Sequence, residues 1–434
     1  MAYTTAEEAL EAASSRFVRN NPLSKAQHEL ACLSLPGGNT RTVLHTDPFP
    51  LTMKRGKGAY VWDLDGHKYL DLTAELSAGL YGHSHPLIRQ ILVGTFDEIG
   101  VSLGSTTVAE QEFAALICQR FDFDKVRMTN SGTEANLHAL ACARAFTGRK
   151  RFVVFKGGYH GAVLSFPHHH KEDMEKNVVD GEQFVVVPGY NELEIARGSI
   201  CEIGKRGELA GVLVEAMQGA GGCILGGKEF LHGVQEETHR WGGVFILDEV
   251  MTSRLAPGGL GRDLGLKPDL VTLGKYLGGG LAFGCFGGRE ELMAVYDPRS
   301  GVLAHSGTFN NNTLVMRVGY EALKGVYTDE VCREFNKRGD GLRRKLEELV
   351  KGTRLSVTGL GSLMTLHFTE EGERGGNERA DLRDLFWFEM LEEGFWITRR
   401  GMIALILETK EEELDGFLEA VGRFLQRRMA IMGL

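Results

Sequence analysis

Residues 272–280 read Thr-Leu-Gly-Lys-Tyr-Leu-Gly-Gly-Gly, which places Lys275 in a turn punctuated by glycines. Upstream, residues 244–248 read Val-Phe-Ile-Leu-Asp, a short apolar run that ends in a carboxylate. A run of this length and composition is typical of a buried strand. The pattern predicts an α/β fold in which Asp248 stands at the carboxyl end of a strand and Lys275 follows it in a turn.

A lysine amine and a carboxylate of this kind are what pyridoxal phosphate chemistry requires of a protein. The amine forms a Schiff base with the cofactor aldehyde and later moves a proton as a general base, while the anion keeps the pyridine nitrogen protonated. We expect Lys275 to do the first two tasks and Asp248 to supply the anion. The alternative interpretation is a surface lysine and a strand-end aspartate on an unrelated α/β enzyme, so other residues must decide.

Residues 130–136, Asn-Ser-Gly-Thr-Glu-Ala-Asn, lie between a strand-like segment and a helical one. A Ser-Gly-Thr turn at a helix start directs backbone N–H groups and hydroxyls at one point, where the helix dipole adds positive potential. Ser131, Gly132 and Thr133 are therefore candidates to bind a phosphate group. An ordinary capping box of Ser131 with Glu134 would explain the same residues.

Two further strand-like runs end in residues that suit a cofactor. The apolar residues 152–155 precede Lys-Gly-Gly-Tyr-His-Gly, in which a flat ring has room to lie on Tyr159 or His160. A plain turn explains these glycines equally well. Glu215 ends another apolar run, at the sheet edge where open α/β proteins bind ligands.

Together these segments resemble the class III pyridoxal phosphate enzymes of fold type I. The resemblance runs from about Leu35 to the end of the chain. The motifs that carry it follow one another at residues 56–66 (Gly-Lys-Gly-Ala-Tyr-Val-Trp-Asp-Leu-Asp-Gly), 81–86 (Tyr-Gly-His-Ser-His-Pro), 130–135, 159–161, 248–250 (Asp-Glu-Val) and 273–275 (Leu-Gly-Lys). The resemblance implies a large domain with a mostly parallel sheet and a smaller α/β domain built from both chain ends.

The resemblance also implies a role for each matching residue. The implied cofactor-binding residues are Ser131, Gly132, Thr133, Tyr159, His160, Glu215, Asp248, Val250, Lys275 and Thr308. Val250 would pack behind the cofactor ring, Tyr159 would stack on its front, and Glu215 would lie near the ring hydroxyl. Thr308 matches the threonine that in this class reaches the phosphate of the partner subunit's cofactor, which implies a homodimer with shared active sites.

Within the class, the closest patterns are the β-amino-acid (β-phenylalanine-type) aminotransferases and the glutamate-1-semialdehyde aminomutases. The aminomutases open with Pro-Gly-Gly-Val-Asn-Ser-Pro-Val-Arg, whereas residues 36–41 read Pro-Gly-Gly-Asn-Thr-Arg and bring the arginine forward without the proline. We therefore expect transfer of an amino group from a β-amino acid to a 2-oxo acid. An aminomutase-like isomerase, a transaminase of carboxylate-free amines and a non-catalytic descendant of such enzymes stay open.

Arginines are the candidates for gripping the substrate carboxylates, because a guanidinium binds a carboxylate through two hydrogen bonds. Arg41 follows a glycine-rich turn, and Arg399 and Arg400 follow the strand-like aromatic residues 395–398. Neighbours on a strand point to opposite faces, so one of the pair is expected to be structural. Arg400 is preferred for the pocket, because in similar aminotransferases the pocket arginine directly precedes a glycine. Tyr81 completes the candidates for substrate binding, and surface arginines at loop ends are the alternative.

The composition limits the kinds of binding partner and the cellular compartment that we expect. The chain has 434 residues, a formal net charge of -9 and seven cysteines. The charge argues against nucleic acid, and an odd cysteine count without a Cys-x-x-Cys pair indicates thiols in a reducing compartment. No signal-peptide pattern and no long apolar run is present, so we expect a cytoplasmic protein without a membrane partner. The adjacent His168, His169 and His170 lack the spacing of metal ligands, so no metal site is expected.

The alternation of strands and helices predicts three segments. Residues 1–75 would begin the small domain, residues 76–325 would form the large cofactor-binding domain, and residues 326–434 would complete the small one. Strands of the large domain are expected near Phe152, Phe184, Gly211, Val244 and Leu270. In the last segment we expect helices over 331–350 and 411–429, and a strand over 363–368.

Overall fold

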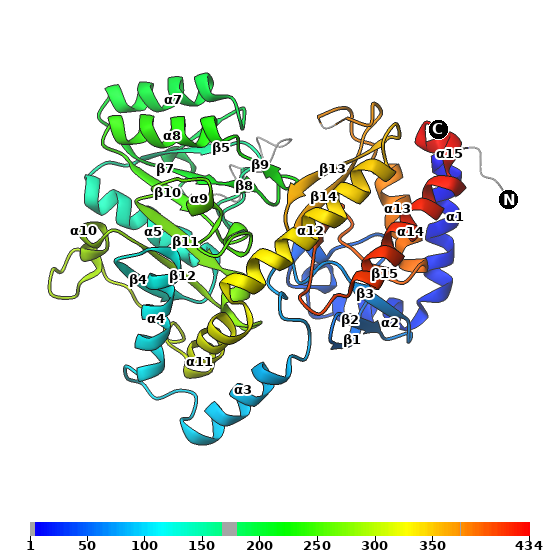
Figure 1. Cartoon of the computed structure of the whole chain (residues 1–434), viewed down its shortest axis with the longest axis horizontal. Coiled ribbons are helices and arrows are strands. Elements are labelled where there is room, and N and C mark those ends of the chain that lie inside the picture. The colour runs from blue at the N-terminus through cyan, green and yellow to red at the C-terminus, as the bar shows by residue number, and fades with distance from the viewer. Residues whose placement is uncertain (1–4, 167–179, 374) are drawn as a thin grey trace. The chain divides into compact units, whose positions relative to one another are not determined.

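The computed structural model describes residues 5–166, 180–373 and 375–434 (Figure 1). Its contacts divide the chain into two compact units. One unit combines the residues up to 85 with residues 338–434, and the other is continuous from 86 to 337. The divisions thus fall after residues 85 and 337, where the sequence placed them after 75 and 325.

The unit of residues 86–337 is built on a seven-stranded sheet. The strand order is β4 (Lys125–Thr129), β12 (Gly284–Gly288), β11 (Leu270–Gly274), β10 (Val244–Asp248), β7 (Leu209–Glu215), β5 (Arg151–Phe155) and β6 (Phe184–Val187). β12 runs antiparallel to both of its neighbours, and the other adjacent strands are parallel. The mostly parallel sheet confirms the predicted fold class, and all five strands expected in this region are present.

Helices cover both faces of this sheet. The helices of this unit include α3 (Pro86–Glu98), α4 (Val108–Phe121), α5 (Gly132–Thr147), α7 (Leu193–Lys205), α8 (Lys228–Arg240), α9 (Leu260–Asp263), α10 (Glu290–Met293) and α11 (Thr313–Glu321). On β5, Val154 is buried in one cluster with Ala135 and Ala139 of α5. The next residue, Phe155, stacks edge-on against Phe230 of α8, with 5.4 Å between ring centroids. Because successive strand residues face opposite sides, α5 and α8 lie on opposite faces of the sheet.

The first and last parts of the chain form one α/β unit. Its strands are β1 (Met53–Lys57), β2 (Tyr60–Asp63), β3 (Lys68–Asp71) and β15 (Phe395–Trp396) in one sheet, and β13 (Leu355–Leu360), β14 (Leu363–Phe368) and β16 (Met402–Ala404) in another. β15 pairs with β3 in parallel, so the two chain ends share a sheet. This confirms the predicted smaller domain assembled from both ends.

Helices pack on these two sheets. The helices of this unit include α1 (Ala6–Asn20), α2 (Pro22–Cys32), α13 (Ala380–Glu392), α14 (Glu411–Arg427) and α15 (Met429–Met432), and the division at residue 337 falls within α12 (Asp329–Leu349). Phe17 of α1 lies 5.2 Å, between ring centroids, from Phe388 of α13, which joins the two ends of the chain in one core. None of the helices in the described residues is long and apolar enough to cross a membrane.

Candidate active site

The two candidate catalytic residues emerge at the same edge of the large sheet. β10 and β11 are adjacent parallel strands in which Asp248 pairs with Thr272. Asp248 is the last residue of β10, and Lys275 directly follows β11 as a half-buried residue. Lys275 has a φ of 55°, in the left-handed region that residues other than glycine seldom adopt. The adjacent parallel strands therefore carry Asp248 and Lys275 to the same edge of the sheet.

Asp248 is held by hydrogen bonds on both of its carboxylate oxygens. Its Oδ2 accepts from the amide Nδ2 of Asn136 at 2.8 Å and lies 2.7 Å from Nδ1 of His160. Its Oδ1 accepts from the backbone N–H of Val250 at 2.9 Å. The side chain is only 4% exposed, so these bonds fix the carboxylate in one orientation. Burial disfavours a charge on His160, yet the hydrogen bond and charge of Asp248 raise the pKa of His160 overall.

Glu215 stands beside Asp248 on the neighbouring strand β7. Its carboxylate oxygens accept from the backbone N–H groups of Tyr159 and Gly219, both at 3.0 Å. Burial raises the pKa of Glu215 to about 7; the charge on His160 works against this rise, and Asp248 adds to it. Glu215 therefore fixes the backbone at Tyr159, whose side chain remains 47% exposed and available to a ring.

The phosphate-binding candidates form the start of α5. Ser131 is the N-cap, and its Oγ accepts from the backbone N–H of Glu134 at 3.2 Å. The carboxylate of Glu134 accepts from the N–H of Asn130 rather than from that of Ser131, so the capping box is incomplete. A hydroxyl that accepts a cap bond can still donate its hydrogen to a phosphate oxygen. The cap and the phosphate interpretation are therefore compatible, and the first-turn N–H groups point the same way.

Close backbone approaches gather the remaining candidates around this loop. A Cβ on Gly132 would lie 2.7 Å from the Val250 methyl carbons, and a Cβ on Gly161, whose φ is +127°, would lie 2.3 Å from Oγ1 of Thr133. Both positions thus require glycine. An amine, a buried anion, a helix start and an exposed aromatic ring lie on elements that meet here. This set of groups fits a phosphorylated pyridine cofactor.

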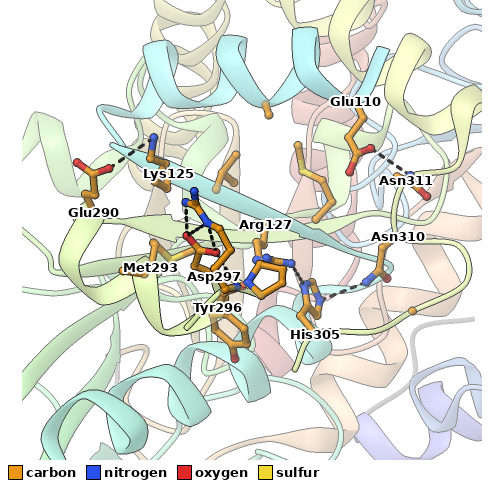
Figure 2. A pocket seen from close by; sticks show the side chains of 17 residues that line it. Glu110, Lys125, Arg127, Glu290, Met293, Tyr296, Asp297, His305, Asn310 and Asn311 are labelled. Atoms are coloured by element: carbon orange, nitrogen blue, oxygen red, sulfur yellow. Dashed lines mark hydrogen bonds and ion pairs between the residues drawn. The ribbon is translucent and has the colours of Figure 1, made fainter. Parts of the chain in front are cut away.

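Thr308 lies in an exposed loop before α11. Neighbouring residues of this loop line a cavity of about 680 Å³ together with Arg127 and Tyr296 (Figure 2). Lys275 and Asp248 are not among the residues that line it.

The C-terminal arginines lie in the unit formed by both chain ends, and their surroundings differ. Arg399 forms an ion pair with Asp384 at 2.8 Å, and its guanidinium lies 5.4 Å from the ring centroid of Trp387. Nη2 of Arg400 lies 3.3 Å from Sδ of Met402. Arg399 is thus engaged in the fold, in keeping with the expectation that one of the two arginines is structural.

Arg41 belongs to the same unit and forms an ion pair with Glu75. Glu75 lies in a turn of four consecutive left-handed residues, 74–77, with φ between 41° and 79°. Oδ1 of Asp71 accepts from backbone N–H groups at the start of this turn. Left-handed backbone costs roughly 1–2 kcal/mol per residue and collects at functional sites. Tyr81, the remaining candidate for substrate binding, is buried and only 2% exposed.

Sequence reasoning missed two residues of the Asp248 network. Asn136 donates to Asp248 and to the carbonyl oxygen of His160 at 2.9 Å, and it accepts from Oγ1 of Thr272 at 2.7 Å. A polar residue of low helix propensity one turn after Gly132 was the available signal. Among the residues that the structure describes, no group of His, Cys, Asp and Glu could hold a metal ion. The three adjacent histidines at 168–170 lie outside the described residues.

Comparison with known proteins places this geometry in a family. The model of the family "Aminotransferase class-III" matches residues 43–425. The chain belongs to the class III aminotransferases. This aminotransferase is 44% identical to the beta-phenylalanine transaminase of Variovorax paradoxus, over 100% of this chain and 99% of that protein. A solved structure of a beta-phenylalanine aminotransferase from the same organism agrees with a TM-score of 0.94 and covers 99% of each chain.

Two other relatives have a higher and a lower sequence identity to this chain. An uncharacterized aminotransferase of Schizosaccharomyces pombe is 47% identical, over 98% of this chain and 97% of that protein. A glutamate-1-semialdehyde 2,1-aminomutase of Bacillus pumilus is more distant, at 33% identity over 94% of this chain and 99% of that protein. The predicted family is confirmed. Class III aminotransferases work with pyridoxal phosphate, so the predicted cofactor is confirmed as well.

Proposed function

We propose that this class III aminotransferase transfers the amino group of a β-amino acid to a 2-oxo acid. The observation that carries the proposal is its 44% identity, from end to end, to an enzyme named for β-phenylalanine. The preserved Lys275 and Asp248 edge supports a catalytic protein rather than a non-catalytic descendant.

Each residue around the sheet edge that carries Lys275 and Asp248 has a separate role. When bound, the cofactor carries the amino group between the two half-reactions and accepts electrons from the substrate carbon. Lys275 moves the proton at that carbon, and Asp248 balances the positive charge of the ring nitrogen. His160 and Asn136 keep Asp248 in place through the hydrogen bonds described above. Ser131, Gly132 and Thr133 would hold the phosphate, Val250 and Tyr159 would contact the ring, and Glu215 would complete the binding site.

Arginines recognise the two substrates. In a β-amino acid the carboxylate lies one carbon farther from the reacting amine than in an α-amino acid, so it needs a guanidinium outside the α-carboxylate position. We assign Arg41 to that carboxylate, because its ion pair with Glu75 on the left-handed turn holds it at a defined place. Arg400 takes the carboxylate of the oxo acid, since Arg399 is bound to Asp384. Tyr81 remains a further candidate for substrate binding.

The proposal includes a homodimer with shared active sites in the cytoplasm. Thr308 serves the cofactor of the second copy. Large apolar side chains around this loop support a covered face, since Phe309 is 63% and Leu103 is 52% exposed. Leu103 lies close to the loop, because the carbonyl oxygen of Ser105 accepts from Asn311 at 3.2 Å.

One experiment tests the substrate class directly. Purified holoenzyme is mixed with α-, β- and ω-amino acids and plain amines, and conversion of the cofactor to its amine form is followed by absorbance. We expect the fastest conversion with a β-amino acid, and no overall turnover until a 2-oxo acid is added. Turnover without any oxo acid would instead identify an aminomutase.

Arg41→Ala provides the matched test of recognition. A charged hydrogen bond contributes about 1.5–3 kcal/mol, so efficiency with the β-amino acid should fall roughly tenfold or more. The loss with a carboxylate-free amine should be much smaller, and Arg41→Lys should be intermediate because it keeps the charge without the bidentate grip. Equal losses with both donors would show that Arg41 is structural and would leave the donor class undefined.

A further inference from the structure

The loop that carries Thr308 is tied to the phosphate-binding loop of its own subunit by one side chain. Oδ1 of Asn310 accepts from Nδ2 of Asn130 at 2.9 Å, and Asn130 directly precedes Ser131. On its other side, Nδ2 of Asn310 lies 3.2 Å from Nε2 of His305 (Figure 2). The amide of Asn310 therefore bridges two segments that are far apart in the sequence.

Both ends of this bridge are anchored. Asn130 donates its backbone N–H at 2.8 Å and its Nδ2 at 3.3 Å to the carboxylate of Glu134, in the first turn of α5. The ring of His305 packs against His138 with 4.3 Å between ring centroids, and against Tyr296 at 5.8 Å. A movement of the phosphate-binding loop would thus be transmitted to Asn310 rather than absorbed by loose side chains.

Asn310 also shapes the turn that presents Thr308. Its backbone N–H donates to the carbonyl oxygen of Gly307 at 3.1 Å, and a Cβ on Gly307 would lie 2.3 Å from Oδ1 of Asn310. The backbone of residue 307 therefore closes directly over the bridging amide. Thr308 lies between the two residues that make this contact, so its position depends on Asn310.

We propose that Asn310 is a positioning residue that couples the two cofactor sites of the dimer. The inference rests on the proposed function, in which Ser131–Thr133 hold the phosphate of the subunit's own cofactor and Thr308 reaches that of the partner. Cofactor bound to one subunit orders Asn130, and Asn130 through Asn310 orders the threonine that serves the other site. The second cofactor then binds more tightly than the first, and the coupling is reciprocal.

The neighbouring Asn311 offers a matched control. Its Nδ2 donates to the carbonyl oxygen of Ser105 at 3.2 Å and to the carboxylate of Glu110 at 3.1 Å, on α4 (Figure 2). Asn311 thus anchors the same loop without contacting the phosphate-binding loop. Loss of Asn311 should loosen the loop but leave the link between the sites intact.

The experiment titrates apoprotein with pyridoxal phosphate and resolves its two binding steps by absorbance and calorimetry. In the unmodified protein we expect the second step to be tighter than the first by roughly 2- to 10-fold, the range of one neutral hydrogen bond. Asn310→Ala should make the two steps equal and speed cofactor loss from the holoenzyme, whereas Asn311→Ala should preserve their ratio. Asn130→Ala tests the same bond from its other end, and the double variant should lose no more coupling than either single one.

Each result decides between the hypotheses. Equal steps in the unmodified protein, an unchanged ratio in Asn310→Ala, or the same change in Asn311→Ala would overturn the inference. If Asn310→Ala fails to fold, the ratio in Asn130→Ala decides in the same way. Failure of the unmodified protein to form a covalent adduct at Lys275 would instead count against the proposed function.

Discussion

Lys275 combines a reactive amine with a left-handed backbone, at a φ of 55°. This conformation costs an ordinary residue roughly 1–2 kcal/mol. Its presence at Lys275 indicates that the position of the amine matters more than a low backbone energy at this residue. The strain is stored where β11 ends and the chain turns beside Asp248.

Lys275→Ala should abolish turnover while the protein stays folded and binds the cofactor without a covalent bond. The alanine keeps the backbone strain but removes the amine that attaches the cofactor and moves the proton. Absorbance spectra before and after extensive dialysis measure both effects, with circular dichroism as the control for folding. A covalent cofactor band that survives in the variant would contradict the assignment.

The two C-terminal arginines should separate stability from recognition. Arg399→Ala leaves the partly buried Asp384 without its close partner and should lower the free energy of unfolding by about 1 kcal/mol. Arg400→Ala should mainly weaken the half-reaction with the 2-oxo acid. Chemical denaturation and single-turnover kinetics on both variants distinguish the roles, and reversed effects would exchange the assignment.

The chemistry of individual residues was enough to single out the candidate catalytic residues, but not the residues that hold them in place by hydrogen bonds. Lys275 and Asp248 could be singled out because Asp248 ends one recognisable strand and Lys275 follows another. The contacts of Asn136 could not, because it bonds to Asp248 and Thr272, more than a hundred positions away. Such pairs depend on how the strands are ordered in the sheet, which local sequence does not encode.

At the level of elements, β12 shows a second limit of sequence reasoning. Three of its five residues are glycines, which have low strand propensity, so its pattern did not indicate a strand. The structure supplies the reason for one of them, since a Cβ on Gly284 would lie 2.2 Å from the carbonyl oxygen of Ser131. A glycine that makes this strand hard to predict thus also leaves room for the candidate phosphate-binding loop.

The segment after β10 supplies a prediction about pH. Glu249 is 3% exposed, and its carboxylate accepts from the N–H groups of Leu260 at 2.7 Å and Gly261 at 2.9 Å. Burial raises its pKa from 4.5 to about 7, against the effect of these bonds. A raised pKa means that its contribution to stability is full below about pH 4.5 and is lost as the pH rises through about 7.

Glu249→Gln removes this titration, because an amide does not ionise in that range. Between about pH 5 and about pH 8, the melting temperature of the variant should therefore fall less than that of the unmodified protein. Differential scanning calorimetry of both proteins at several pH values measures the difference. Parallel pH profiles would show that Glu249 does not titrate as its burial requires.

For the whole molecule, Thr308 gives the sharpest test of shared sites. Thr308→Ala should hold the cofactor less tightly, because in the proposed dimer this threonine serves the cofactor of the partner subunit. A mixed dimer made with Lys275→Ala subunits should regain normal retention at its one competent site, since the threonine there comes from the other subunit. Light scattering establishes the dimer, and a fully active monomer would rule the model of shared sites out.

The pairing of β15 with β3 affects the order in which parts of this protein can fold during translation. Strand β3 is made early, but its partner starts at residue 395, and at ordinary translation speed the ribosome needs roughly a quarter of a minute to a minute to reach it. The continuous segment 86–337 contains all seven strands of its own sheet, and its synthesis is complete before residue 395 is reached. Meanwhile β3 keeps an open edge that invites wrong pairing. A nascent chain stalled before residue 395 should therefore combine a folded cofactor-binding unit with an unfinished N-terminal sheet, the part that co-translational chaperones would protect.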